Sequence, residues 1–318
     1  MRTAIFSIVL MITGSALAQT GPSLMIKLFD EGKNVEAWTE VTILSDGQTS
    51  DQTPDVDVDL TIIDSDIRWR ITGEEDRIIT LGMSLTHLDI STSFALLPDQ
   101  FTDHSFAVGF NVGQYNEWQI DAVAGFGYAG SNAYGEGDAW YGLADLIFTK
   151  ELDEKSTLRF MIDYNGNRTI WPDLPLPAIA YSHESSDTFS YTLGVPFSSL
   201  KWLPSAGWTV TVDYAVPFNL GAKVDYAITE PLHVFAAYQK RLDAFVLSGD
   251  VKDRRYIFEQ SRIEAGVNWK PCDHVTLEVA GGHAFDMEFE RGFDVRDTNG
   301  ITELDDEGYI RVAANVSF

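Results

Sequence analysis

The strongest constraint on the fold is an apolar residue at every second position, repeated in segment after segment of the chain. In residues 274–290 the even positions are polar or small, whereas the odd positions are Val275, Leu277, Val279, Gly281, His283, Phe285, Met287 and Phe289. An α-helix cannot gather such a set on one face, but a β-strand does so because successive side chains point to opposite faces. Residues 157–167, 208–216 and 222–229 repeat the pattern.

These runs predict an all-β protein with about fourteen strands, or twelve in the alternative. The expected strands are 35–44, 56–71, 77–90, 104–114, 117–129, 138–151, 157–169, 187–202, 207–217, 220–229, 232–247, 255–270, 274–290 and 307–318. In the second of these the apolar phase changes between Leu60 and Ile67, which predicts a bulge or an early end of the strand.

The first eighteen residues have the pattern of a cleavable signal peptide. Arg2 precedes the apolar stretch 4–13, and Ala16-Leu17-Ala18 forms a small-x-small cleavage signal before Gln19. Residues 19–34 are then expected to be a periplasmic lead-in to a transmembrane domain at 35–318. No run of eighteen apolar residues follows residue 18, so a membrane would have to be crossed by strands.

The charge balance and the single cysteine narrow the class of protein further. Acidic residues outnumber basic ones by 48 to 22, and this acidity argues against a nucleic-acid partner, whose phosphates need a basic surface. Cys272 is the only cysteine, so the chain cannot form an internal disulfide. An exported chain of this size without disulfides needs another means of stabilisation, and a closed sheet would supply it.

The connections between the expected strands alternate between short turns and long loops. The short turns are 72–76, 114–116, 152–155, 203–206, 230–231 and 271–273, and the long loops are 45–55, 91–103, 130–137, 170–186, 248–254 and 291–306. Only the connection 218–219 is short at a place where the alternation requires a long loop. This asymmetry is typical of outer-membrane β-barrels, which have tight periplasmic turns and long outer loops. With an even number of strands, both termini are expected on the periplasmic side.

Tryptophans at the expected strand ends point to the same environment. Trp118, Trp202, Trp208 and Trp269 all flank short turns. Indole rings prefer the membrane interface, where the ring is in an apolar layer and the N–H stays hydrated. These four residues therefore predict an aromatic belt at the periplasmic interface.

The polar face of the strands carries charges of both signs. In lipid, unpaired backbone groups are costly, so a spanning sheet must close, and charged side chains must face the lumen. The predicted lumen-lining charges are Asp66, Arg68, Arg70, Asp121, Arg159, Asp163, Asp213, Lys223, Asp225, Arg241, Asp243, Arg262, Glu264, Glu278 and Arg311. They would either line a narrow, cation-preferring pore or pair across the lumen and close it.

The last strand carries a resemblance to known proteins. Residues 307–318 alternate and end on Phe318, and outer-membrane β-barrels commonly end in an alternating strand with a terminal phenylalanine. This resemblance implies an antiparallel up-and-down transmembrane barrel whose terminal strand is read by the barrel-insertion machinery. The segments 195–202 and 216–226 also resemble an uncharacterised outer-membrane barrel family, which has no function to carry over.

The sequence thus predicts an outer-membrane barrel acting as a passive pore for small solutes or ions, with outer-membrane lipid around it and without cofactor or catalytic residues. The alternatives are a closed barrel acting as a scaffold or adhesin through its outer loops, and a lipid-modifying enzyme using His183-Glu184-Ser185. A partial match to a calcium-binding loop makes four residues candidate metal ligands: Asp297, Asn299, Glu303 and Asp306. An exposed acidic turn explains the same residues.

Overall fold

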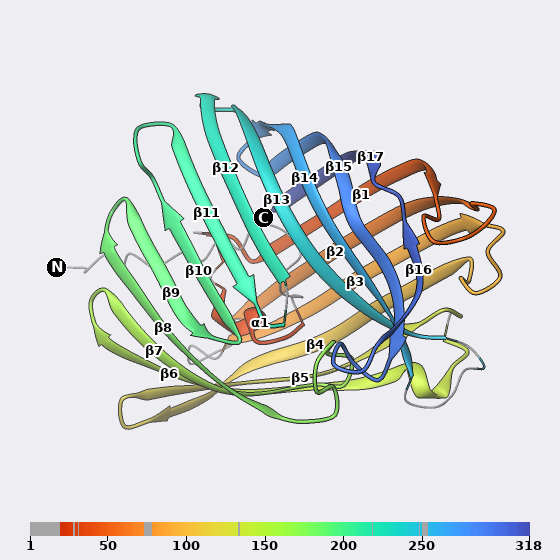
Figure 1. Ribbon diagram of the computed structural model, residues 1–318. Coiled ribbons are helices and arrows are strands. Elements are labelled where there is room, and N and C mark those ends of the chain that lie inside the picture. Colours follow the sequence, from red (N-terminus) through yellow and green to blue (C-terminus); the bar gives the residue numbers. More distant parts are fainter. Residues whose placement is uncertain are drawn as a thin grey trace.

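The computed structural model describes residues 20–27, 29–30, 32–72, 78–132, 134–217, 219–247, 249 and 254–318, so the predicted signal peptide at 1–18 lies outside it. The described chain is almost entirely β-structure wound into one barrel (Figure 1). Its only helical elements are α1 (Ser23–Ile26) and the 3-10 turn η2 (Gly137–Ala139). Neither is long enough to cross a membrane, and no spanning helix occurs in the described residues.

Seventeen strands are present in the described chain. They are β1 (Val35–Gln48), β2 (Asp57–Thr72), β3 (Ile78–Thr92), β4 (Gln100–Tyr115), β5 (Trp118–Gly130), β6 (Trp140–Asp153), β7 (Ser156–Asn165), β8 (Leu176–Ser186), β9 (Phe189–Val195), β10 (Phe197–Trp202), β11 (Trp208–Ala215), β12 (Asn219–Thr229), β13 (Leu232–Val246), β14 (Arg255–Cys272), β15 (Val275–Gly292), β16 (Asn299–Leu304) and β17 (Glu307–Ser317).

Sixteen of these strands form the closed wall. Each of β1 to β15 pairs antiparallel with the next, β15 also pairs with β17, and β17 pairs with β1 to complete the ring. The remaining strand, β16, pairs with β15 as an arm of the last loop. The barrel class is as predicted, but the count of fourteen, or twelve in the alternative, is wrong.

The two strands missing from the prediction lie next to each other. The predicted loop 170–186 contains β8, whose many small residues and two prolines nearby hide its alternation. The predicted strand 187–202 is a hairpin, because β9 and β10 pair with each other on either side of Pro196. Proline has no N–H to donate to a ladder, so it belongs at a turn or an edge.

The phase change in β2 is not caused by a bulge. β2 pairs with β3 without interruption from Val58 to Thr72. Leu60 and Ile62 are buried inside the barrel, whereas Trp69, at an odd position, is exposed on its outer face. Along β2 the apolar side chains switch from the inner face to the outer face. The reason is that the inside of the barrel is apolar at one end of the strand and charged further along it.

A bulge does occur in β15, where the sequence pattern showed none. Two residues of β15 stand opposite Gln260 of β14, and Asp286 adopts a left-handed backbone with φ of 49°. The extra residue reverses which side chains point inward. Val279 is therefore exposed outside, while Met287 and Phe289, which share its odd parity, are buried inside.

The barrel has a wide end and a narrow end. We call the end with residues 49–56, 93–99 and 293–298 the long-loop end, and the other the short-turn end. Near the long-loop end β13 touches β5 directly: Val246 bridges to Gly130, and the N–H of Ser131 donates to the Val246 carbonyl at 3.0 Å. There the ring consists of nine strands, β1 to β5, β13 to β15 and β17, since β6 to β12 stop short (Figure 1).

The outer face of the wall is apolar. Large hydrophobic side chains exposed there include Phe106, Phe126, Ile162, Leu193, Val279 and Ile310. A closed barrel with such a face satisfies its backbone hydrogen bonds internally while presenting hydrocarbon to its surroundings, which is the architecture of outer-membrane barrels. Trp118, Trp202, Trp208 and Trp269 all lie at strand ends on the short-turn side.

Candidate functional site in the barrel interior

The inside of the narrow half is filled by apolar side chains, which we call the apolar layer. Its buried members are Leu44, Val58, Leu60, Ile62, Leu88, Ile90, Leu97, Phe101, Phe245, Tyr256, Phe258, Ala284, Met287, Phe289, Leu304 and Tyr309. Phe101 stacks on Phe245 with ring centroids 4.8 Å apart, and Phe258 stacks on Phe289 at 4.6 Å. Phe258 and Phe289 are partners on the adjacent strands β14 and β15, and Phe289 also stacks on Phe101 of β4 at 6.3 Å, so rings from separate parts of the wall meet in the interior.

Next to the apolar layer lies a layer of ion pairs. Arg241 of β13 donates to Asp64 of β2 at 2.6 Å, across the barrel, and to Asp243 on its own strand at 2.8 Å. The side chains of Arg241 and Asp64 are almost completely buried. Because a buried charge is tolerated only when it is paired, these contacts hold opposite walls of the barrel together.

A second group of ion pairs continues this layer around the wall. Arg311 of β17 binds Glu40 at 3.0 Å and Glu264 at 2.6 Å and also contacts Glu278. Arg262 reaches Glu40 at 3.4 Å, and Lys223 binds Glu278 at 2.9 Å. Here the predicted lumen-lining residues Lys223, Arg262, Glu264, Glu278 and Arg311 are brought together, and most of their charge is compensated locally.

In the wide half a separate stretch of chain occupies the interior, and we call residues 20–27 the plug. The hydroxyls of Thr20 and Ser105 share a hydrogen bond of 2.7 Å. Leu24 is buried among wall side chains of β4 to β8. Arg68 donates to the Lys27 carbonyl at 2.5 Å, and burial together with the charge of Arg68 lowers the pKa of Lys27.

The wall beneath the plug combines larger apolar side chains, Val123, Ile147 and Met161, with small residues. Ala107 and Ala178 contact the apolar side of the plug, and a side chain at Gly109 would collide with Met25. Such small inward residues leave a space that the neighbouring strands do not fill themselves. The structure places residues 20–27, which belong to the predicted lead-in 19–34, against the inner face of the wall.

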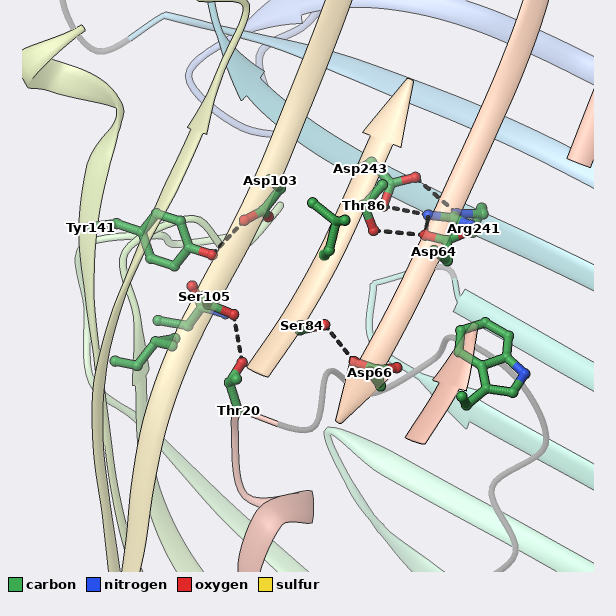
Figure 2. Close-up of a pocket in the computed structure, with 14 residues that line it drawn as sticks. Thr20, Asp64, Asp66, Ser84, Thr86, Asp103, Ser105, Tyr141, Arg241 and Asp243 are labelled. Atoms are coloured by element: carbon green, nitrogen blue, oxygen red, sulfur yellow. Dashed lines mark hydrogen bonds and ion pairs between the residues drawn. The ribbon is translucent and has the colours of Figure 1, made fainter. Parts of the chain in front are cut away.

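A cavity of about 130 Å³ lies between the plug and the ion pairs (Figure 2). Thr20 lines it on the plug side, and Arg241 lines it on the other. Its charged lining consists of that arginine and four carboxylates, Asp64, Asp66, Asp103 and Asp243. Ser84 donates to Asp66, and Tyr141 donates to Asp103 at 2.6 Å. The lining therefore carries a formal excess of acid.

The other predicted lumen residues have local partners and do not join the ion-pair layer. Arg68 binds Glu36 at 2.5 Å, and Arg70 donates to the Lys33 carbonyl at 2.8 Å. Four more are as follows: Asp121 accepts from Asn111, Arg159 donates to Ser182, Asp163 pairs with Arg168, and Asp225 contacts His233. Asp213 is buried, and one of its oxygens has no hydrogen-bond partner among the described residues.

Sequence reasoning missed four important interior acids: Glu36, Glu40, Asp64 and Asp103. Asp64 has the same parity as Asp66 and Arg68, so the alternation in β2 could have identified it. Glu40 alternates with Val41 and Ile43 in the same way. Asp103 gave less signal, because the expected strand began only at residue 104.

The four candidate metal ligands of the acidic loop lie in and around β16. Asn299 and Glu303 are in β16, and Asp297 accepts a hydrogen bond from the Phe293 N–H. Within the part of the chain that the structure describes, no group of three or more histidine, cysteine or carboxylate residues is placed to hold a metal. Asp306 instead lies 3.8 Å from His283.

The three residues of the predicted histidine-serine alternative, His183-Glu184-Ser185, all lie in β8. His183 lies in β8 rather than in a loop, and its ring shares a hydrogen bond of 2.9 Å with Ser156 of β7. That serine also accepts a hydrogen bond from Tyr181. The Asp153 carboxylate is hydrogen-bonded to the Lys155 N–H and to Ser156, and these bonds together with the charge of His183 lower its pKa.

Comparisons with known proteins find the barrel shape and little more. No protein-family model and no curated protein matches the chain. Among solved structures, it is similar to a mutant of the TodX monoaromatic hydrocarbon channel, with a TM-score of 0.46, 9% identity and coverage of 93% of this chain and 92% of that one. An outer membrane channel from Pseudomonas putida F1 gives a TM-score of 0.37, 10% identity and 90% and 96% coverage. A mutant porin from Rh. blastica gives a TM-score of 0.39 and 11% identity, with coverage of 90% of this chain and 99% of that one.

Proposed function

We propose that this chain is an outer-membrane barrel for the passive passage of small solutes or cations, and that the plug is its removable gate. The observation that carries the proposal is that the wide half is occupied by a separate stretch of chain that packs over the small wall residues Ala107, Gly109 and Ala178. A barrel that only had to be closed would need no such stretch, because larger wall side chains would fill the space.

The plug is held by polar contacts at both ends and by the packing of Leu24, Met25 and Ile26 between them. Its polar anchors include the Thr20–Ser105 hydrogen bond at one end and the Arg68 contact with the Lys27 carbonyl at the other. Its helix, α1, has four residues and no side-chain cap, and a helix so short is not stable by itself. Residues 20–27 can therefore leave the wall without breaking any strand pairing.

The preference for cations is supported by the charge of the cavity. Its lining has four carboxylates against one guanidinium, and displacement of the plug would open it to the short-turn end. Fixed carboxylates in a confined space raise the local concentration of cations. Salt screens this effect, because the Debye length falls from about 10 Å at 0.1 M to about 3 Å at 1 M.

A second candidate function is a closed barrel acting as a scaffold through its outer loops. The apolar layer and the ion pairs of Arg241 and Arg311 favour it, because both obstruct the lumen independently of the plug. In this alternative, removal of the plug would leave the barrel impermeable.

Conductance in a planar bilayer tests the two functions. Three forms are compared: the processed wild type, Gly109→Val, which displaces Met25, and a deletion of residues 20–27. We expect both variants to conduct at least tenfold more than the wild type, with a reversal potential favouring cations that weakens from 0.1 to 1 M salt.

Gly142→Val is the matched control, because a side chain at Gly142 would meet only Tyr164 at an ordinary 3.5 Å. It should leave the conductance at the wild-type level. If neither plug variant conducts more than this control, the passage function is wrong and the scaffold takes its place.

A further inference from the structure

We propose that Asp145 and Asp163, two neighbouring carboxyl groups in the wall of the wide half, form a binding site for a single proton. The closed barrel holds this proton at neutral pH, and its loss at higher pH releases the plug. The inference goes beyond the proposed passage function, because it concerns what retains the plug and does not require that the barrel conduct.

The strand register brings the two carboxyl groups together. Asp145 of β6 stands directly opposite Asp163 of β7. Both point inward, because they share the parity of the buried Ile147 and Met161 two positions along the same strands. The Cβ atoms of such antiparallel partners lie about 4.5–5.5 Å apart, and two like charges directly opposite each other destabilise a sheet. The pair therefore needs a cation or a proton to reduce its charge.

Only one of the two acids is bound by a cation among the described residues. Arg168 pairs with the Asp163 carboxylate and also donates to the Asp163 carbonyl at 3.0 Å. Asp145 is only 5% exposed, and neither of its oxygens has a hydrogen-bond partner in the described chain. An ionised carboxylate in such a place is costly, whereas a protonated carboxyl is neutral and can donate a hydrogen bond to its neighbour. The geometry therefore fits a neutral Asp145 beside an ionised Asp163.

The other charged groups of this region interact elsewhere. The charges that act on Asp145 are those of its partner and of Arg168. On the strands beside it, Asp121 of β5 and Arg159 of β7 attract each other. Lys27 of the plug faces the charges of β1 and β2. Since none of these three described cations is placed to neutralise Asp145, a proton is the group that can.

The plug packs beside this pair. Val123, the partner of Asp145 on β5, and Ile147 on β6 belong to the apolar cluster that Leu24 of the plug completes. Departure of the plug opens this side of the pair to water, which stabilises the ionised form of Asp145. The closed state therefore binds the proton more tightly than the open state. By linkage, a rise in pH favours release of the plug and a fall in pH favours closure.

Infrared spectroscopy detects the proton directly. Purified barrel in detergent at neutral pH should show the C=O band of a protonated carboxyl, and Asp145→Asn should remove the intensity of one such group per barrel. Asp225→Asn is the matched control, because Asp225 contacts His233 elsewhere in the wall, and its spectrum should retain the band. If Asp145→Asn does not fold, Asp163→Asn frees Arg168 to pair with Asp145 and should remove the band as well.

Thiol labelling measures the retention of the plug. Ser23→Cys places a cysteine at a buried position of the plug, and Cys272→Ser removes the only native thiol. Relative to the denatured chain at the same pH, labelling of the folded barrel should rise at least tenfold between about pH 6 and about pH 10, as the proton is lost. Asp145→Asn is neutral at every pH and should keep the plug protected throughout. Lys27→Met, which removes the titratable side chain of the plug, should leave the rise in place.

Two results would overturn the inference. One is a carboxyl band that is the same in the wild type and in both variants of the pair, and the other is a rise in labelling that Asp145→Asn does not suppress. A protonated pair in a barrel that never conducts would contradict only the passage function. A conducting barrel whose spectrum lacks the band would contradict only this inference.

Discussion

The interiors of the narrow and wide halves of the barrel are filled in different ways. In the narrow half the wall supplies the filling: Phe101, Phe245, Phe258 and Phe289 point into the interior and stack on one another. In the wide half the wall carries small residues such as Gly109, and a separate stretch of chain takes up the space. Strands β1 to β5 run through both halves, so the change occurs within single strands.

The number of strands in the ring explains the difference. Barrels of about eight strands have an interior that side chains can fill, whereas sixteen strands leave a channel. The contact of β13 with β5 reduces the ring to nine strands at the long-loop end, which brings aromatic rings within stacking distance. Beyond it the full ring is too wide, and only another segment of chain can fill it. Stability should therefore depend on the narrow half and gating on the wide half.

The largest expected effect on stability is in the apolar layer. Phe258→Ala removes a fully buried ring that stacks on Phe289, and such a truncation costs about 3–5 kcal/mol. This loss of unfolding free energy should appear in a urea titration in detergent micelles, in which the folded fraction is measured by the heat-dependent gel shift of the barrel. Val267→Ala, on the outer face of the same strand, should change the free energy of unfolding by less than about 1 kcal/mol. Equal effects of the two variants would contradict the division into halves.

The next effect concerns the ion pairs that link opposite walls. Arg241→Met leaves Asp64 and Asp243 buried without their cation, and removal of one partner of a buried pair costs about 3 kcal/mol. Lys240→Met is the matched control, since Lys240 pairs with Glu259 at the partly exposed outer face, where a salt bridge contributes less than about 1 kcal/mol. Adding Asp64→Asn to Arg241→Met should recover part of the stability. If the added substitution makes the barrel less stable still, the pair does not act as described.

The smallest effect is a local one in the outer loops. The Asp294 carboxylate accepts hydrogen bonds from the Trp171 N–H and from Arg296. Burial raises the pKa of Asp294, but the hydrogen bonds and the charge of Arg296 outweigh burial, so that its pKa is lowered overall. A carboxyl with a lowered folded pKa stabilises the contact above its ordinary pKa and loses it as the pH falls through the folded one. Hydrogen exchange in residues 166–175 should therefore accelerate only below about pH 4, with the barrel intact.

Asp294→Asn provides the comparison for that measurement. The amide cannot titrate, so exchange in residues 166–175 should be faster than in the wild type at neutral pH and should then show no acid transition. An unchanged transition in this variant would assign the pH dependence to another group.

The alternation of side chains was enough to predict an all-β barrel, most of its strands and the charged interior. The prediction failed where inside and outside have similar polarity. In β2 the inward side chains change from Leu60 and Ile62 to Asp64 and Asp66, a change that in the sequence alone predicts a bulge or an early end of the strand. In β15 the apolar odd positions continue through Asp286, so nothing in their pattern marks the real bulge.

What the sequence determined by itself is local: the period of two, the short turns, and the acids and bases that share a face of each strand. Only the tertiary structure decided which of these charges meet, because Arg241 and Asp64 are 177 positions apart and come together through closure of the ring. The position of the plug was also decided by the tertiary structure. Residues 20–27 carry no signal for burial inside a barrel, and their place depends on the space left by Ala107, Gly109 and Ala178 on strands far along the chain.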